Sequence, residues 1–277
     1  MGTLTARRPW TWAASAAVVV VAAAIATSIA QNPNIDHAAI LRYQFAPAIL
    51  SGLGTTLSLA AIAGAIGLGL GIVLALMRLS PDVVLRSASG VYTWAFRGTP
   101  LLVQILFWGN LALLFKRVGL YIPFTDIALV SVNTNSLITP FVASILALGL
   151  NEGAYMAEIV RAGIAAVDRG QVDAARALGM TSGLLMRRIV LPQALAVAIP
   201  PSVNQFTNLL KATSLVSVIA GGDLLTEAEN ISSANLHTIE LLLVATFWFL
   251  AITTLSTFVQ HLVERRLAAY LPSAHTR

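Results

Sequence analysis

Residues 49–77 read ILSGLGTTLSLAAIAGAIGLGLGIVLALM and contain no charged side chain. About 20 apolar residues are enough for one helix to cross a bilayer, so this stretch predicts a transmembrane helix. It lacks the alternation of apolar and polar residues that is typical of a barrel strand. Because lipid offers backbone amides no partner, a spanning segment that is not a barrel strand must be a helix. The stretch therefore predicts an all-α fold, a polytopic helical membrane bundle.

The composition of the whole chain agrees with this prediction. Of 277 residues, 57% are hydrophobic and 10% are charged, and the mean hydropathy is +0.80. A soluble domain carries roughly a quarter charged residues, so lipid must be the main solvent. The third predicted span is short for a crossing unless it begins near Trp94. In all, six spans are expected, at Trp12–Ala30, Ile49–Met77, Leu101–Phe115, Leu137–Ala157, Ala194–Val216 and Ile239–Val263.

The distribution of Lys and Arg predicts the orientation of these spans. With the N-terminus in the cytoplasm, thirteen of the seventeen basic residues, Arg97 among them, fall on the inside. This bias satisfies the positive-inside rule, and both termini are expected in the cytoplasm. The net charge of +5 then reflects cytoplasmic loops rather than nucleic-acid binding. The basic residues left outside or in the outer half of the membrane are Arg42, Lys116, Arg117 and Lys211.

The first span has two interpretations. Arg7 and Arg8, an apolar run and small residues before Gln31 also resemble a secretory signal peptide. The apolar run exceeds the roughly 7–15 residues of a signal core, which favours an uncleaved anchor. Residues 31–47 then form an external linker. The sequence thus divides into a segment 1–48 with the extra span, a main transmembrane domain 49–265, and a cytoplasmic tail 266–277.

The sequence shows no site of its own for a metal or a nucleotide. It contains no cysteine, four scattered histidines and no G-x-x-x-x-G-K-[ST] pattern, so any nucleotide energy must come from a partner chain. The second span is rich in glycine, but no strand precedes these glycines and no Lys-Ser/Thr pair follows them. Their spacing of three and four indicates close helix packing instead. They are Gly52, Gly54, Gly64, Gly67, Gly69 and Gly71.

Residues 161–192 concentrate charge between the fourth and fifth spans. Gly170 is expected to break the chain before a helix at Gln171–Leu178. Asp173 would lie in the first turn of that helix, where a carboxylate complements the helix dipole, and Gly179 would supply a left-handed stop. A segment with this much local order is more than a solvated tether between two spans.

A second short helix is expected to begin after Thr181 or Ser182 and to run to Val190, where Pro192 prevents its continuation. The first helix would offer Asp173 and Arg176 for salt bridges. Its exposed small side chains would let the backbone enter a groove, and they are Ala174, Ala175 and Ala177. The pattern predicts a surface for another protein.

The order of residues in this segment resembles a known loop. Asp173-Ala174-Ala175, three residues, Gly179, nine residues and I-x-L-P ending at Pro192 match the E-A-A-x3-G-x9-I-x-L-P loop of bacterial binding-protein-dependent ABC importers. In that family the loop docks on the ATPase, and Asp173 stands where Glu is usual. The resemblance assigns ATPase coupling to Gly170, Gln171, Asp173, Ala174, Ala175, Arg176, Gly179, Leu191 and Pro192.

Further strings are similar to the polar-amino-acid permeases of that family. They are FRGTPLLVQ at 96–104, GQ-x-DAA at 170–175, LPQA at 191–194 and LK-x-TSL at 210–215. Over residues 49 to about 265 the resemblance implies a type I importer membrane domain, with a five-helix core and an extra N-terminal span. Ala212 stands where the family is expected to have a polar residue.

The resemblance also implies partners. They are a second permease copy or paralogue, ABC subunits that hold ATP and Mg, and an extracytoplasmic solute-binding protein that delivers an amino acid. The chain itself would bind no cofactor and catalyse no reaction, and it would reside in the bacterial inner membrane. ATP binding would swing the spans between inward- and outward-facing states.

Ionisable groups inside a membrane are costly and are functional candidates by default. We expect Glu152, Asn204, Gln205 and Asn208 to form a polar layer that borders the pathway, although such residues also serve as hydrogen-bonding links between helices. Lys211, Thr213 and Ser214 are further pathway candidates. With a rise of 1.5 Å per residue, Lys211 lies ~15 Å from Glu152 in depth, too far for both to clamp one small zwitterion. Glu158 and Arg161 are expected to pair on one helix face.

Two other classes of function compete with the importer. An autonomous secondary carrier or channel would need no ATPase, but such proteins usually show internal repeats and broken helices, and the sequence shows no convincing repeat. An intramembrane enzyme would need a convergent catalytic constellation, and none is visible.

Overall fold

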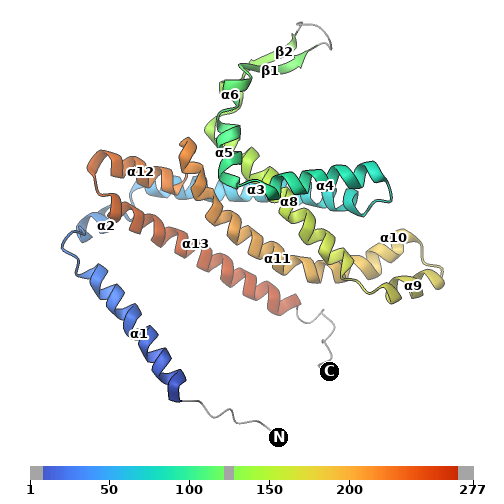
Figure 1. The fold of residues 1–277 in the computed structure, drawn as a ribbon, viewed down its shortest axis with the longest axis horizontal. Coiled ribbons are helices and arrows are strands. Elements are labelled where there is room, and N and C mark those ends of the chain that lie inside the picture. Colours follow the sequence, from blue (N-terminus) through green and yellow to red (C-terminus); the bar gives the residue numbers. More distant parts are fainter. Residues whose placement is uncertain (1–8, 122–127, 268–277) are drawn as a thin grey trace.

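The computed structural model describes residues 9–121 and 128–267, which are almost entirely helical (Figure 1). The first half contains α1 (Pro9–Ala30), α2 (His37–Tyr43), α3 (Pro47–Leu79), α4 (Val83–Gly98), α5 (Leu101–Gly109), α6 (Leu111–Leu114), β1 (Arg117–Tyr121) and β2 (Ala128–Asn133). The second half contains α7 (Thr134–Leu137), α8 (Pro140–Ala165), α9 (Arg169–Ala177), α10 (Ser182–Leu185), a π-helical turn at Met186–Val190, α11 (Leu191–Ala212), a 3-10 turn at Thr213–Ile219, α12 (Leu224–Asn235) and α13 (Thr238–Leu267).

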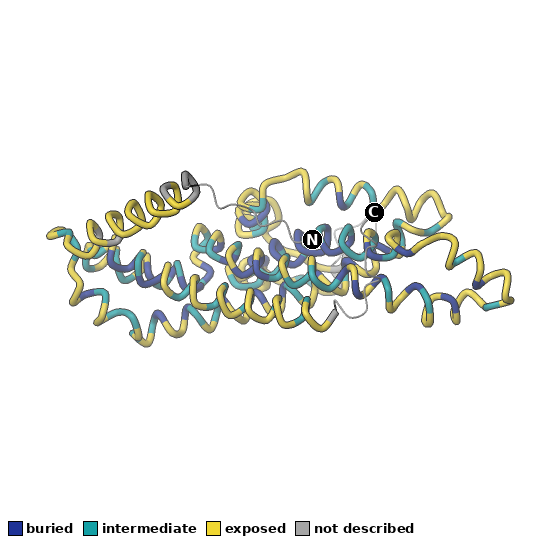
Figure 2. Tube along the Cα trace, turned by 90° about the horizontal axis from the view of Figure 1, so that it is seen from below, coloured by how far each residue is buried: buried dark blue, intermediate teal, exposed yellow. Residues whose placement is uncertain are grey.

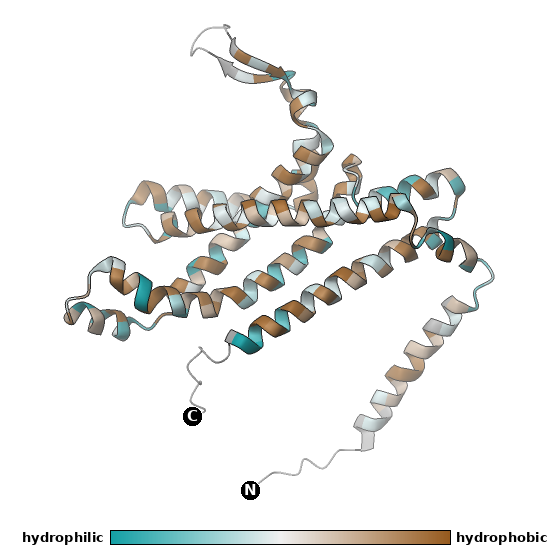
Figure 3. Cartoon of the chain, turned by 180° about the vertical axis from the view of Figure 1, so that it is seen from behind, coloured by the Kyte–Doolittle hydropathy of each residue, from teal (hydrophilic) through white to brown (hydrophobic). Residues whose placement is uncertain are grey.

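Three helical stretches among the described residues are long and apolar enough to cross a membrane: Pro47–Leu79, Ser182–Ile219 and Thr238–Arg266. Apolar side chains lie exposed along them, as expected where lipid replaces water (Figures 2 and 3). The helix α8 has comparable length, but Glu152, Glu158 and Arg161 lower its hydropathy. The predicted helical membrane bundle is confirmed.

The helix α3 packs along α8 through glycines. A Cβ on Gly67 would lie 2.5 Å from Cγ of Glu152, and one on Gly71 would lie 2.9 Å from the backbone N of Ala157. The predicted role of the glycines is confirmed for these two and for Gly52 and Gly64, which face α12 and α11. It is wrong for Gly54 and Gly69, where no described atom lies within 4 Å of an added Cβ.

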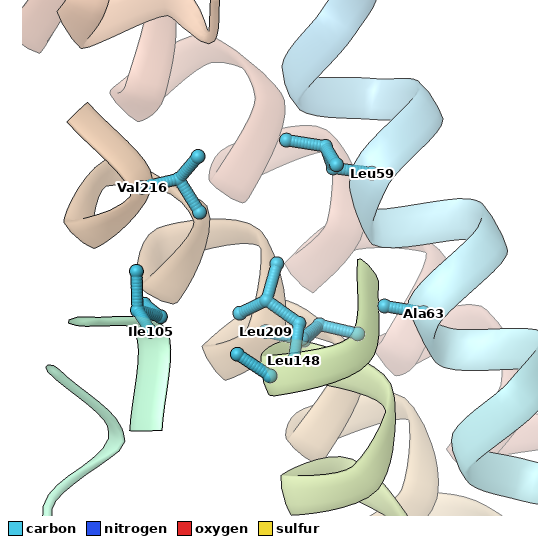
Figure 4. Close-up of a cluster of buried hydrophobic side chains, with 7 residues drawn as sticks. Leu59, Ala63, Ile105, Leu148, Leu209 and Val216 are labelled. Atoms are coloured by element: carbon cyan, nitrogen blue, oxygen red, sulfur yellow. The ribbon is translucent and has the colours of Figure 1, made fainter. Parts of the chain in front are cut away.

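Four helices and the 3-10 turn after α11 converge on the central apolar core. Figure 4 shows Leu59 and Ala63 of α3 facing Ile105 of α5, Leu148 of α8, Leu209 of α11 and Val216. A second cluster joins α3, α12 and α13 through Ile49, Leu224, Leu241 and Val244. The core therefore runs through the bundle and leaves the outer faces to lipid.

The third predicted span was wrong, because Leu101–Phe115 does not form one crossing helix. The helix α5 ends at Gly109 after nine residues, about 13 Å of rise, and Asn110 separates it from α6. Preceding it is α4, a helix that the sequence did not predict, and Pro100 marks a sharp elbow between the two (Figure 1). The chain thus bends inside the bundle.

Two segments between the predicted spans carry structure. The linker at 31–47 includes α2, which packs on α13, and Nε1 of Trp248 donates to the carbonyl of Gln44 at 2.8 Å. Strands β1 and β2 form an antiparallel hairpin, with Arg117 opposite Asn133, that projects away from the bundle (Figure 1). The described part of α1 stays exposed along its length (Figure 2).

The contact between α3 and α8 predicts a stability difference between two neighbouring glycines. Gly71→Ala should destabilise the protein by about 1–3 kcal/mol, because its methyl group overpacks against Met156 and Ala157. Gly69→Ala, on the open face of the same helix, should be neutral or slightly stabilising, because Ala is the better helix former. Thermal unfolding of the purified variants in one detergent checks this, and equal midpoints would contradict the packing.

Candidate functional site

The charged segment folds into a small unit at one end of the bundle (Figure 1). The helix α9 begins after Asp168, whose carboxylate accepts from the backbone N of Gln171 at 3.1 Å. Two predictions were wrong here: Gly170 lies within the first turn of α9 instead of breaking the chain, and Asp173 lies beyond that turn. The reason is that Asp168 caps the helix and shifts its start towards the N-terminus.

The predicted stop at Gly179 is confirmed. Gly179 has φ +77, its N–H donates to the carbonyl of Arg176, and the N–H of Met180 donates to the carbonyl of Ala175. These two bonds define a Schellman motif, which satisfies carbonyls at the end of a helix and requires a left-handed residue. The direction in which the chain leaves α9 depends on this glycine.

One face of α9 is open and the other is buried. Asp173 and Arg176 lie 3.8 Å apart with side chains 73% and 67% exposed, and Ala174 and Ala177 are exposed beside them. The expected exposure of Ala175 was wrong, because this residue packs in a local cluster. The other members of that cluster are Val167, Leu185, Val190 and Ala194. A rigid base therefore presents the polar face of α9.

The second helix does not end at Pro192 as predicted. The chain passes from α10 through the π-helical turn directly into α11, and the N–H of Leu191 donates to the carbonyl of Met186, five residues back. Pro192 sits in the first turn of α11, where its missing N–H is tolerated. The π-turn rearranges the hydrogen bonds ahead of the proline, so the helix continues.

Gln193 joins the two helical pieces. Its Nε2 donates to Oε1 of Gln171 at 2.7 Å and to the carbonyl of Ile189 at 3.0 Å. The first bond ties α9 to α11, and the second satisfies a carbonyl beside the π-turn. Through Gln193, α9 is therefore hydrogen-bonded to a helical stretch that is long and apolar enough to cross a membrane.

A polar cavity of about 250 Å³ lies between α8 and α11. Glu152 is only 2% exposed, and Nε2 of Gln205 donates to its Oε2 at 3.0 Å. Oε1 of Glu152 has no hydrogen-bond partner in the described part of the chain. Asn208 and Tyr155 also line the cavity. The expected polar layer is thus present for Glu152, Gln205 and Asn208.

The remaining candidates from the sequence lie outside this cavity. Asn204 and Lys211 are exposed and do not line the cavity, although they lie on the same stripe of α11 as Asn208. The hydroxyls of Thr213 and Ser214 donate to the carbonyls of Leu210 and Lys211 in their own helix. The predicted pair of Glu158 and Arg161 is confirmed at 2.8 Å.

Sequence reasoning missed how the elbow at Pro100 is held. Nε2 of Gln104 donates to the carbonyl of Phe96 at 2.9 Å, to the carbonyl of Thr99 at 3.1 Å and to its Oγ1 at 2.9 Å. Nδ2 of Asn151 reaches the same Phe96 carbonyl at 3.0 Å. A Thr-Pro pair followed by a lone Gln in an apolar helix was the available signal, because proline leaves helix carbonyls without donors.

Comparison with known proteins gives one family. The sequence model of this family, which is described as a binding-protein-dependent transport system inner membrane component, matches residues 67–269. The chain is 38% identical to an arginine transport system permease protein of Corynebacterium glutamicum, over 94% of this chain and 80% of that protein. It is 36% identical to an L-cystine transport system permease protein of Bacillus subtilis, over 84% of this chain and 92% of that one.

Solved structures agree. A crystal structure described as an amino acid ABC transporter with histidines is 36% identical, with a TM-score of 0.72, covering 84% of this chain and 99% of that one. A crystal structure described as a bacterial ABC transporter involved in the import of the acidic polysaccharide alginate is 16% identical, with a TM-score of 0.60. The match covers 94% of this chain and 96% of that one. At this identity the likeness shows the fold alone.

The elbow predicts a measurable cost for losing Gln104. Gln104→Met keeps the side-chain volume but leaves the carbonyls of Phe96 and Thr99 with fewer donors, which should cost about 1–3 kcal/mol. Thr99→Val removes only one of the three acceptors and should cost less. Thermal unfolding in detergent checks the order of the two variants, and a larger effect of Thr99→Val would contradict it.

Proposed function

Because the chain belongs to the family of binding-protein-dependent transport system inner membrane components, we propose that its polar cavity and its α9 surface are the pathway and the motor contact of an importer. The chain is the permease subunit of an ABC importer for amino acids, a transport component rather than an enzyme. The similarity to an arginine permease over 94% of the chain carries this conclusion. It gives no support to the rival secondary carrier or channel.

The exposed face of α9 is proposed as the contact for the ABC ATPase. Asp173 and Arg176 pair with each other on the exposed face, and the small side chains of Ala174 and Ala177 allow close approach of a partner. Ala175 holds α9 in place by packing in the local cluster. The remaining coupling residues act by shaping the unit, and they are Gly170, Gln171, Gly179, Leu191 and Pro192. ATP and Mg belong to the partner, which closes on ATP and moves α9.

The cavity beside Glu152 is proposed as a part of the substrate pathway. A buried carboxylate with one oxygen free of partners offers an acceptor for the ammonium group of an amino acid. Gln205 and Asn208 add amide groups on the facing helix. Relatives named for arginine and for L-cystine favour an amino acid as the solute.

The assembly and its orientation complete the proposal. A second permease copy or paralogue pairs with this chain, and a solute-binding protein delivers the amino acid from outside. The protein resides in the bacterial inner membrane, with both termini in the cytoplasm. In Figure 1, α1 and α13 both extend away from the end that holds α2 and α12, and α9 lies at the far end too, which supports this orientation.

The proposed motor contact predicts loss of the complex. Asp173→Ala combined with Gly179→Ala should abolish co-purification with the ABC ATPase that accompanies the wild-type chain in native membranes. Alanine at φ +77 costs about 1–2 kcal/mol and so destabilises the end of α9 that shapes the contact, and loss of the carboxylate removes a charge from its exposed face. Glu229→Ala, an exposed acid on α12, and Gly183→Ala, a helical glycine of α10, should keep the complex. An intact complex in the double variant would contradict the assignment.

The proposed pathway predicts a transport defect at Glu152. Glu152→Gln keeps the shape of the side chain but removes the charge, and uptake of tritiated amino acid into proteoliposomes with the whole assembly should fall at least about tenfold. Lys211→Met should remain near the wild-type rate, because Lys211 does not line the cavity. Unchanged uptake and affinity in Glu152→Gln would rule out this pathway.

A further inference from the structure

An apolar groove of about 490 Å³ lies between α3, α8 and α11, and its described lining residues all differ from those of the polar cavity. Leu68, Ile72 and Leu76 form its α3 wall, at intervals of four residues that place them on one stripe of that helix. Leu191 and Leu195 lie on the α11 wall, and all five side chains are exposed. The groove is therefore an open trough between two rows of large apolar side chains.

The floor of the groove is α8, because small residues hold both walls close to it. A Cβ on Gly163 of α8 would lie 2.8 Å from the carbonyl oxygen of Ala194 and 2.9 Å from Cβ of Ala198. On the other side, α3 lies against α8 at Gly71. Val160 of α8 lines the groove between the two walls. The space is thus set by tight backbone contacts on either side.

The chemistry of the groove suits a hydrocarbon chain. Of the described residues that line it, Ser202 alone carries a hydroxyl, amide or charged group, and its hydroxyl donates to the carbonyl of Ala198 at 2.9 Å. From Leu191 to Ser202 the α11 wall rises ~16 Å, about half of the ~30 Å hydrocarbon core of a bilayer. An amino acid would leave its charges without partners here, whereas an acyl chain of one leaflet needs none.

Two arginines stand at the end of the groove that adjoins α10. Arg187 directly follows Met186, which lines the groove, and it precedes Leu191 of the α11 wall by four residues in one continuous helical stretch. Arg187 and Arg188 are exposed, and neither belongs to an ion pair between described residues. Long arginine side chains can reach along a surface while the charged end stays at the membrane border.

The acidic residues at the end of α8 and in α9 already have partners. Glu158 pairs with Arg161 at 2.8 Å, and Asp173 pairs with Arg176 at 3.8 Å. Asp168 caps α9. The positive charge at the mouth of the groove is therefore left for a group outside the chain. Basic pockets between transmembrane helices on the cytoplasmic side are a known setting for anionic lipid headgroups.

We propose that this groove binds an acyl chain of an anionic phospholipid of the cytoplasmic leaflet, with the phosphate held by Arg187 and Arg188. The inference goes beyond transport and takes from the proposed function only the orientation, in which α9 faces the cytoplasm. A guanidinium binds phosphate with two parallel hydrogen bonds, which a lysine cannot match. The headgroup then lies beside the π-turn that joins α10 to α11, next to the proposed motor contact.

The test titrates dioleoyl phosphatidylglycerol or dioleoyl phosphatidylcholine into the full-length protein, purified in detergent with its accompanying subunits, and counts bound lipid by native mass spectrometry. The wild type should bind phosphatidylglycerol at least about tenfold more tightly. Arg187→Gln combined with Arg188→Gln should reduce this preference to within about twofold while phosphatidylcholine binding stays unchanged. Ile72→Trp fills the groove and should weaken both lipids at least about fivefold, whereas Ile62→Trp, at an exposed residue of α3 that does not line the groove, should weaken neither.

A matched control separates the groove from general surface charge. Arg265→Gln combined with Arg266→Gln removes an adjacent pair of exposed arginines from the end of α13 and should keep the preference. An equal loss in this control, or an unchanged preference in the groove variant, overturns the proposal.

Two further outcomes identify another occupant and also overturn the proposal. The first is unchanged lipid binding in Ile72→Trp together with loss of a second permease copy, which makes the groove a contact between permeases. The second is displacement of phosphatidylglycerol by glycerol 1-phosphate, which makes the arginines a site for free phosphate. Because binding in detergent requires neither transport nor an orientation, its failure leaves the proposed pathway and motor contact standing.

Discussion

The packing of α3 against α8 at Gly67 is the contact on which the rest of this membrane protein depends. Any side chain at Gly67 would collide with Glu152, since even a Cβ would lie 2.5 Å from its Cγ. The helix α8 therefore lies directly on α3, and the same length of α8 carries Asn151 to the elbow and Glu152 to the cavity. In lipid, where apolar surface gives helices no preference for one another, such close backbone contact is a main source of association.

The elbow at Pro100 depends on this arrangement in turn. Proline removes a donor at the point where α4 ends, and at this depth no bulk water replaces it. Gln104 supplies its amide from one side and Asn151 from the other, so the elbow is fixed to both α5 and α8. A bend that would be unstable alone is therefore held in place by side chains of two neighbouring helices.

The features that sequence predicted are those set by local chemistry. The length of the apolar runs predicted the long helices, and the glycine in the charged segment predicted that α9 stops at Gly179. Glu152 and Gln205 were expected in one polar layer because they lie at similar depth, and the structure joins them by a hydrogen bond. The missed features depend on distant contacts. Helix α4 packs on the α8 surface, Ala175 is buried by the local cluster, and Gln193 bonds a carbonyl beside the π-turn before Pro192.

The two sides of the cavity are both connected to the surface of α9. Glu152 belongs to α8, which runs without a break to Ala165 just before α9. Gln205 belongs to α11, and α11 is bonded to α9 through Gln193 and Gln171. A displacement of α9 therefore reaches both partners of the Glu152–Gln205 hydrogen bond by different routes. The cluster around Ala175 packs α9 against the π-turn and α11 through Val190 and Ala194. If α9 is the motor contact and the cavity is part of the pathway, as proposed, the Glu152–Gln205 hydrogen bond is where a displacement of α9 would change the shape of the cavity.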